Sequence, residues 1–288
     1  MTAAPQPPAQ ILSCAGRAID LSQPHVMGIL NVTPDSFSDG GRFVSRDTSL
    51  RHAAAMVAQG ASFVDVGGES TRPGAAAVSV AEELDRVISV VEAISRELDV
   101  VVSVDSSKAE VIHAAAGVGA GLINDVRALQ EPGALLAAAE SGLPICLMHM
   151  QGQPVDMQLS PKYSGVVGDV LAFLDMRVHA CEAAGVHRSR IVIDPGFGFG
   201  KTAAHNLQLL NRLPEFVQTG FPVLVGLSRK SLLGRITGRA IDDRLAASVA
   251  AAALAVTKGA RIIRAHDVPA TVDAVKMAQA MIRESLDE

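Results

Sequence analysis

The chain has 288 residues, of which 49% are hydrophobic, and a formal net charge of −5 at pH 7. This length and hydrophobic content are sufficient for one large core. The acidic balance argues against a protein that coats nucleic acid or an anionic membrane. No apolar run is long enough to span a bilayer.

The first ten residues, MTAAPQPPAQ, contain no basic residue and no apolar signal-peptide core. They predict a frayed tail and a cytoplasmic protein. Residues 1–22 are interpreted as this tail with a lead-in, and residues 23–288 as one domain. Cys14, Cys146 and Cys181 are widely separated, so the sequence predicts neither a disulfide framework nor a zinc site.

Eight short β-branched apolar runs recur along the chain. They are continuous rather than alternating, as in parallel strands that are buried on both faces. The runs are HVMGIL (25–30), SFVDV (62–66), VVVSV (100–104), GLIND (121–125), PICLM (144–148), RIVID (190–194), FPVLVG (221–226) and ARIIRA (260–265).

Helical patterns lie between these runs, for example over 79–98 and 242–259. Ser79 with Glu82, and Ser107 with Glu110, have the spacing of capping boxes and predict two helix starts. Glycines predict where four helices end. These glycines are Gly60, Gly142, Gly185 and Gly259.

Eight alternations of strand and helix, with no linker, predict a single (β/α)8 TIM barrel of the α/β class. A doubly wound open sheet is the alternative. In a barrel, the active site lies at the carboxyl ends of the strands. Polar residues are found at or just after every predicted strand: Asn31, Glu69, Thr71, Arg72, Asp105, Asn124, Asp125, His149, Asp194, Ser228, Arg229, Lys230, Ser231, Arg264, His266 and Asp267. One such residue could simply cap a helix, but eight polar strand ends indicate a site.

Two kinds of chemistry are present among these residues. Asp105, Asn124 and Asp194 combine carboxylates with an amide, which suits a flat heterocycle with several N–H donors and a carbonyl. The second kind suits a phosphate or diphosphate, because it combines guanidinium groups, hydroxyls and helix starts. It comprises Arg72, Arg264, His266 and the SRKS run at 228–231. Arg72 is therefore interpreted as an anion clamp on a mobile loop.

Two further motifs, at His149 and in the segment DPGFGFGKT, resemble a metal ligand and a phosphate loop but are interpreted otherwise. His149 has no partner at metal-ligand spacing, so it is predicted to be structural. The DPGFGFGKT segment resembles a phosphate loop, but Pro195 stands where such a loop needs glycine. We interpret it as a glycine loop that packs close to a flat ligand.

Several motifs together resemble dihydropteroate synthase in order and spacing, from about residue 25 to the C-terminus. They are GILNVTPDSFSDGG, DVGGESTRPGA, INDV, MHMQG, IDPGFGFGK, GLSRKS and HDV. Members of this family condense 6-hydroxymethyl-7,8-dihydropterin diphosphate with 4-aminobenzoate to give 7,8-dihydropteroate and diphosphate, and sulfonamides compete for the aminobenzoate site. The resemblance also implies a homodimer.

The resemblance implies a role for each matching residue. Asp194 and Asn124 would hold the pyrimidinone edge of the pterin, Asp105 a ring nitrogen and Lys230 the N5/O4 side. Asn31 would help to bind Mg²⁺ beside the diphosphate, and Asp35 would stabilise a cationic intermediate. The diphosphate contacts would be Thr71, Arg72, Arg264 and His266. The aminobenzoate pocket would be Phe37, Pro73, Phe199 and Ser231.

Two rival functions share part of this pattern. A pterin-binding methyltransferase barrel would need the Asp105, Asn124 and Asp194 group, but not Arg72, SRKS or Arg264 for a diphosphate. A non-catalytic pterin-binding paralogue would be expected to lack a diphosphate or loop residue, and none is missing here.

Overall fold

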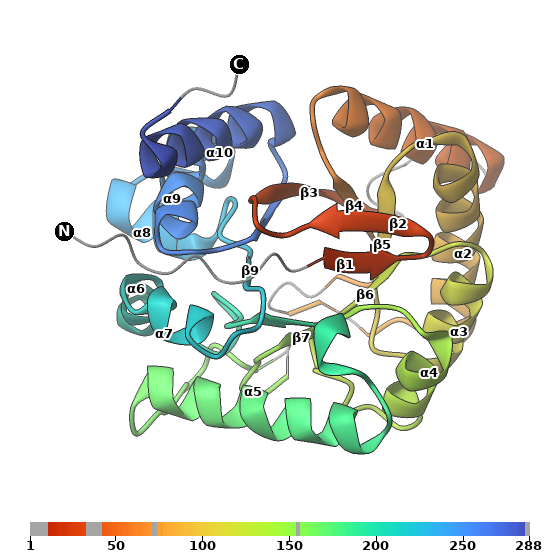
Figure 1. Cartoon of the computed structure of the whole chain (residues 1–288), viewed down its shortest axis with the longest axis horizontal. Helices are drawn as coiled ribbons and strands as arrows, with labels where there is room; N and C mark the ends of the chain where they lie inside the picture. The colour runs from red at the N-terminus through yellow and green to blue at the C-terminus, as the bar shows by residue number, and fades with distance from the viewer. Residues whose placement is uncertain (1–10, 33–41, 71–73, 76, 154–155, 286–288) are drawn as a thin grey trace.

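A ring of parallel strands forms the centre of the protein (Figure 1). The computed structural model describes residues 11–32, 42–70, 74–75, 77–153 and 156–285. The eight strands of the ring are β3 (His25–Asn31), β4 (Phe63–Gly67), β5 (Val101–Asp105), β6 (Leu122–Asp125), β7 (Ile145–Met148), β8 (Ile191–Asp194), β9 (Leu224–Val225) and β10 (Ile262–Ala265). Each of the eight predicted apolar runs overlaps one of these strands.

The strands follow the order β8-β7-β6-β5-β4-β3-β10-β9. Between β8 and β9, Ile193 forms a parallel bridge with Val223, and the Ile193 N–H donates to the Pro222 carbonyl over 3.0 Å. The two ends of the sheet therefore meet. This confirms the predicted barrel and excludes the doubly wound alternative, whose sheet would have two separate edges.

Helices surround the barrel and connect its strands (Figure 1). They are amphipathic or rich in alanine, and their apolar faces pack on the strands. They are α1 (Arg42–Ala58), α2 (Val80–Glu97), α3 (Ala109–Gly117), α4 (Ala134–Ser141), α5 (Val166–Ala183), α6 (Ala203–Asn211), α7 (Leu213–Val217), α8 (Ser231–Thr237), α9 (Leu245–Thr257) and α10 (Val268–Arg283), with short 3₁₀ turns at Arg188–Arg190 and Ile241–Asp243. Within the described ranges, no helix has the length and apolar content to cross a membrane.

Of the two predicted capping boxes, one is confirmed and one is wrong. Ser79 caps α2, and its partner Glu82 accepts from the Ser79 backbone N–H. Helix α3 instead begins after Lys108, without a side-chain cap. Ser107 does not cap it because its hydroxyl donates to the carboxylate of Asp125 on the neighbouring strand β6. The hydroxyl of Ser107 therefore satisfies the buried carboxylate of Asp125 instead of capping α3.

The four glycines that were predicted to end helices all have a positive φ, between 72° and 99°. This left-handed backbone is unfavourable for residues with a Cβ, so glycine allows the chain to turn away from the helix. The four are Gly60, Gly142, Gly185 and Gly259, at the ends of α1, α4, α5 and α9.

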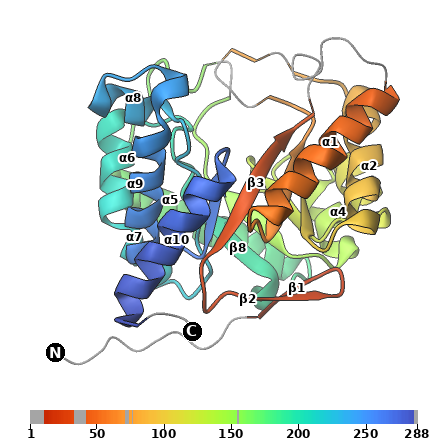
Figure 2. The same cartoon turned by 90° about the horizontal axis from the view of Figure 1, so that it is seen from above.

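A β-hairpin closes the amino-terminal end of the barrel. Its strands are β1 (Ile11–Cys14) and β2 (Arg17–Asp20), and it lies beneath the barrel in Figure 2. Leu12, Cys14 and the following Leu21 are buried in one cluster with a residue from each strand of the barrel: Met27, Phe63, Val101, Leu122, Cys146, Val192, Leu224 and Ile262. The lead-in segment thus fills the base, and the opposite end is left for the site.

Candidate active site

The carboxyl ends of the parallel strands bring the predicted polar residues to one end of the barrel. A small cavity of ≈ 60 Å³ lies there. Seven of its lining residues were predicted as site residues: Asp105, Asn124, Asp194, Phe199, Lys230, Arg264 and His266. The structure therefore brings together the three residues expected to hold the heterocycle and four of those in the predicted anion group: Ser228, Lys230, Arg264 and His266.

Asp65 is a carboxylate at the centre of this cluster that sequence reasoning missed. It lies in the middle of β4, with 0% of its surface exposed. Its Oδ2 accepts from Arg264 Nε (2.6 Å) and Asn124 Nδ2 (3.1 Å). Its Oδ1 accepts from Ser103 Oγ (2.5 Å). An aspartate inside the otherwise apolar run FVDVG was the signal that could have found it, because buried charges are normally paired.

Arg264 connects the two predicted groups. Besides its bond to Asp65, its Nη2 donates to Asp105 Oδ2 over 2.9 Å. Burial acts to lower the pKa of Arg264, but Asp65 and Asp105 together raise it above its ordinary value. Burial and then the charge of Asp65 raise the pKa of Asp105, against the opposing effect of Arg264. One guanidinium is thus shared by two carboxylates.

The loop after β8 forms another wall of the cavity. The Gly196 N–H donates to Asp194 Oδ1 over 2.7 Å, which fixes the carboxylate at the strand end. Lys230 donates to the carbonyl of Phe197, and its Nζ lies 4.3 Å from the centre of the Phe199 ring. Burial lowers the pKa of Lys230 to about 8 and raises that of Asp194.

The other predicted anion-binding residues differ in whether they line the cavity or pair with another side chain. His266 Nδ1 lies 3.0 Å from Ser228 Oγ, and both residues line the cavity. Arg229 instead forms a two-bond ion pair with Asp267, at 2.5 and 3.0 Å. Its guanidinium is therefore paired with the residue that precedes α10. This differs from the anion-binding role that the SRKS run predicted for Arg229.

Ser231 and Asn31 lie at the border of the site. Ser231 is the first residue of α8 and lines a second cavity of ≈ 340 Å³, between α6, α8 and the loop after β7. Asn31 is the exposed last residue of β3. The remaining predicted site residues lie outside the described part of the chain: Asp35, Phe37, Thr71, Arg72 and Pro73.

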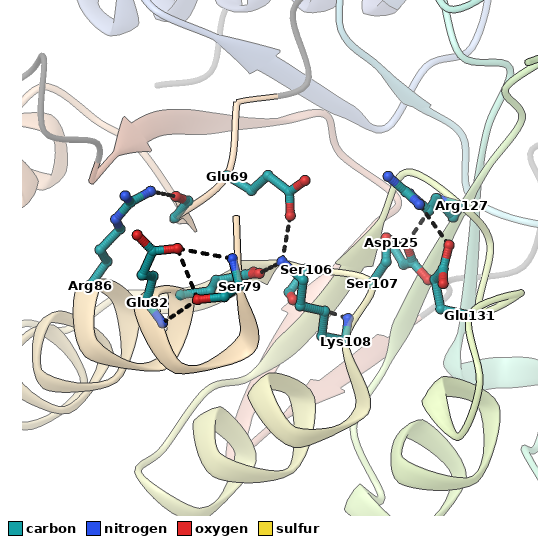
Figure 3. A network of polar contacts seen from close by, with 12 residues as sticks. Glu69, Ser79, Glu82, Arg86, Ser106, Ser107, Lys108, Asp125, Arg127 and Glu131 are labelled. Carbon is teal, nitrogen blue, oxygen red and sulfur yellow. Dashed lines mark hydrogen bonds and ion pairs between the residues drawn. The ribbon is translucent and has the colours of Figure 1, made fainter. Parts of the chain in front are cut away.

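A polar network supports the rim beside this site (Figure 3). Lys108 Nζ contacts Glu69 Oε2 at 2.5 Å and also the buried carboxylate of Glu83. Arg86 Nη1 donates to the Gly68 carbonyl over 2.9 Å. These contacts tie the segment after β4 to α2 and to the end of β5. Glu69 thus has a structural role, because its ion pair with Lys108 holds the segment after β4 in place.

Asp125 also belongs to this network, and it serves the loop after β6. It is fully buried and accepts from Ser107, from the Arg127 N–H (2.8 Å) and from the Leu129 N–H (2.6 Å). Its oxygens are occupied by these donors. Its neighbour Asn124 lines the cavity instead.

His149 is buried at the end of β7, and its Nδ1 lies 2.9 Å from Lys201 Nζ. Burial lowers its pKa to about 3, so the ring is neutral. No group of three or more His, Cys, Asp or Glu side chains suited to a metal occurs among the described residues. This environment agrees with the structural role predicted for His149.

Comparisons with known proteins agree with this arrangement. The sequence profile of the pterin binding enzyme family matches residues 27–266. The dihydropteroate synthase of Haemophilus influenzae is 54% identical over 264 residues, which are 92% of this chain and 96% of that protein.

Solved structures are also similar over nearly the whole chain. One is the Yersinia pestis dihydropteroate synthase in a sulfonamide drug complex, with a TM-score of 0.91, 53% identity and coverage of 96% of this chain and 100% of that one. Another is the Xanthomonas albilineans dihydropteroate synthase in complex with 7,8-dihydropteroate, with a TM-score of 0.85, 44% identity and coverage of 95% and 98%. The chain therefore belongs to the dihydropteroate synthases of the pterin-binding enzyme family.

Proposed function

We propose that the chain condenses 6-hydroxymethyl-7,8-dihydropterin diphosphate with 4-aminobenzoate, giving 7,8-dihydropteroate and diphosphate. The observation that carries this proposal is the convergence of Asp105, Asn124 and Asp194 on one cavity with the guanidinium of Arg264. Hydrogen-bond acceptors that suit a heterocycle therefore lie in the same cavity as a cation that suits an anion. A substrate that joins a pterin to a diphosphate needs both.

The pterin would lie across the mouth of the barrel. Asp194 and Asn124 would pair with the donors of its pyrimidinone edge, and Asp105 would meet a ring nitrogen. Lys230 would donate to the N5/O4 side, and its place beside Asp194 in the cavity lining supports this.

The diphosphate would be held by Arg264 and His266, together with Thr71 and Arg72. Guanidinium groups suit this role because their paired N–H donors match phosphate oxygens. Arg264 would have to exchange its contact with Asp105 for one with the substrate. The buried Asp65, which holds Nε, would keep the guanidinium in place during this exchange.

The arylamine would occupy the space next to Phe199 and Ser231, bounded by Phe37 and Pro73. Phe199 lines the pterin cavity, whereas Ser231 lines the neighbouring cavity. The two substrates would thus meet near Phe199 and Lys230. Sulfonamides, which have the same arylamine, would compete at this position.

Mg²⁺ fits the residues at the rim of the barrel. The ion usually keeps several waters and takes one or two protein oxygens together with substrate phosphates. The exposed amide of Asn31 at the end of β3 would supply such an oxygen. When bound, the ion would neutralise part of the diphosphate charge.

In the reaction, the bond from the pterin methylene carbon to the bridging oxygen breaks, and diphosphate leaves with the electron pair. The arylamine nitrogen bonds to this carbon and loses a proton to water. Arg264, His266 and Arg72 would stabilise the negative charge on the leaving group, and Asp35 the cationic pterin. The amine is already nucleophilic, so alignment and electrostatics carry the catalysis.

The enzyme would act on small molecules as a homodimer, with no nucleic-acid or membrane partner. Exposed apolar side chains on α9 and α10 support the dimer, because these two helices pack together and carry Leu254, Met277, Met281 and Ile282 at the surface. Light scattering should give twice the mass of the chain, and a monomer would contradict this. A cytoplasmic location stays a prediction from the sequence.

Diphosphate release and dihydropteroate formation test the function together. The purified protein is incubated with the pterin diphosphate, Mg²⁺ and 4-aminobenzoate, and then without the arylamine. We expect one dihydropteroate for each diphosphate when both substrates are present, with inhibition by a sulfonamide. Pterin binding without product would favour a binding paralogue. Methyl transfer to a corrinoid protein would favour the methyltransferase rival.

A further inference from the structure

Lys201 is a buried lysine with no part in the chemistry described above. It follows the glycine loop (residues 195–200) and has only 3% of its surface exposed. We propose that Lys201 is a positioning residue that holds the glycine loop against the loop after β7, and through this loop the groups that bind the pterin. This inference rests on the proposed function, since its consequence is the placement of the substrate-binding groups.

The contacts of Lys201 come from both loops. Its Nζ lies 2.8 Å from the Gly196 carbonyl oxygen and 3.0 Å from that of Phe199. On the other side it lies 2.9 Å from His149 Nδ1 and 3.2 Å from the His149 carbonyl oxygen. An ammonium has three N–H donors and no acceptor, so it suits an environment made of carbonyl oxygens and an imidazole nitrogen.

The two loops approach so closely that only glycine fits at their contact points. A Cβ on Gly196 would lie 1.9 Å from the His149 carbonyl oxygen, and one on Gly200 would lie 2.2 Å from that of Gln151. Tyr163 adds a hydroxyl bond of 2.8 Å to the Gly200 carbonyl. Carbonyl dipoles that converge in this way repel one another, and the Lys201 ammonium offsets that repulsion.

The glycine loop in turn places three groups of the site. The Gly196 N–H holds Asp194, the Phe197 carbonyl accepts from Lys230, and Phe199 lies under the Lys230 ammonium. A shift of the loop would move the pterin acceptor, the pterin donor and the aromatic wall together. Lys201 lines the second cavity with Ser231 but does not line the pterin cavity, so it would act on the pterin through these groups.

Lys201 and Asp194 also influence each other electrostatically. Burial lowers the pKa of Lys201 well below its ordinary value, the charge of Asp194 opposes this fall, and Lys230 adds to it. Burial raises the pKa of Asp194, and the Gly196 N–H, Lys230, Lys201 and Arg264 oppose this rise. Removal of the Lys201 charge would let the pKa rise further. Asp194 would then take up a proton at a higher pH and lose one of its acceptor sites for the pterin.

The test compares Lys201→Met, which removes charge and donors, with Lys201→Gln, which keeps two donors without charge. Lys162→Met is the matched control, because Lys162 is an exposed lysine in the neighbouring loop. The KM values for both substrates, kcat, the pH profile of kcat/KM and the thermal unfolding midpoint are measured for each variant.

For Lys201→Met we expect the KM for the pterin diphosphate to rise at least about tenfold, the scale for buried carbonyls that lose their donor. The acidic limb of its kcat/KM profile should move to higher pH. Lys201→Gln should recover part of the KM but keep the displaced limb, because an amide restores hydrogen bonds and no charge. Lys162→Met should behave as the parent protein.

Folded Lys201 variants with parental KM values and pH profile would overturn the proposal. Variants that are unfolded at the assay temperature would also overturn it, because Lys201 would then support the fold as a whole. A parent protein that makes no dihydropteroate would instead contradict the proposed function. The two failures are thus distinguishable.

Discussion

Arg264 donates from Nε to Asp65 Oδ2 over 2.6 Å, although the two residues are 199 positions apart in the chain. They lie on β10 and β4, the two strands that flank β3 in the barrel. The same guanidinium reaches Asp105 on β5. A cation expected at the diphosphate is therefore oriented by carboxylates at the pterin end of the site.

Asp65→Asn should affect both stability and catalysis. The variant keeps the shape of the side chain but leaves the buried guanidinium with Asp105 as its one carboxylate partner. We expect a loss of about 3 kcal/mol in unfolding free energy, the scale for breaking a buried ion pair, with a raised KM for the pterin diphosphate. Urea unfolding and steady-state kinetics measure these. The exposed Asp273→Asn serves as control, and equal behaviour of the two variants would refute the role of Asp65.

Asp194→Asn should weaken pterin binding by at least about 2 kcal/mol, because an amide NH₂ would then face the donors of the ligand. Isothermal calorimetry with the hydroxymethyl pterin measures the change in Kd. Circular dichroism establishes that the variant is folded. An unchanged Kd would remove Asp194 from the site.

The lowered pKa of Lys230 should make both the unfolding free energy and kcat/KM depend on pH. Burial lowers its pKa to about 8, against about 10.4 in an unfolded chain. Between these values the unfolded chain binds more protons, so the unfolding free energy should increase with pH in this window. The kcat/KM for the pterin diphosphate should fall above about pH 8, since the ammonium donor is lost.

Lys230→Met supplies the control for that pH dependence. Its unfolding free energy should increase less than that of the parent between pH 8 and about 10.4, because Lys230 no longer titrates while Lys201, whose pKa burial also lowers, remains. Parent kcat/KM values that stay level to pH 9.5 would contradict the predicted role of the ammonium.

Gly196→Ala should be strongly destabilising. The new Cβ would meet the His149 carbonyl oxygen at 1.9 Å, on a backbone with φ of +71°. We expect a loss of more than about 3 kcal/mol, since the backbone of one loop would have to move. The matched change Gly168→Ala, at an exposed position in α5 where a Cβ meets nothing within 4 Å, should stabilise the helix by about 0.5–1 kcal/mol. Thermal unfolding measures both, and similar midpoints would contradict the close packing.

Leu12→Ala should separate stability from activity. Leu12 is fully buried in the hairpin that fills the barrel base, so a cavity there should lower the unfolding free energy by about 2–5 kcal/mol. The site lies at the opposite end, so kcat should stay at the parent value below the unfolding transition. Ile11→Ala, half exposed in the same strand, should cost less than about 1 kcal/mol. A large loss of kcat in folded Leu12→Ala would show that the base and the site are coupled.

Local sequence patterns were sufficient for the repeating architecture. Continuous β-branched runs predicted all eight strands, because a strand buried on both faces must be apolar along its length. Glycines predicted four helix ends, because a helix commonly ends at a residue with a left-handed backbone, and glycine adopts that backbone whatever the rest of the fold does. The rim residues Asp105, Asn124 and Asp194 followed from the same logic, because parallel strands in a barrel all end on one side.

The pairing of side chains was decided only by the tertiary structure. Ser107 has a capping sequence but donates to Asp125, and Arg229 resembles an anion ligand but pairs with Asp267. Asp65 and Lys201 were not predicted, because their partners come from other strands and loops. A buried charge takes whichever opposite charge or dipole the fold brings within hydrogen-bond distance, and local sequence does not specify that neighbour.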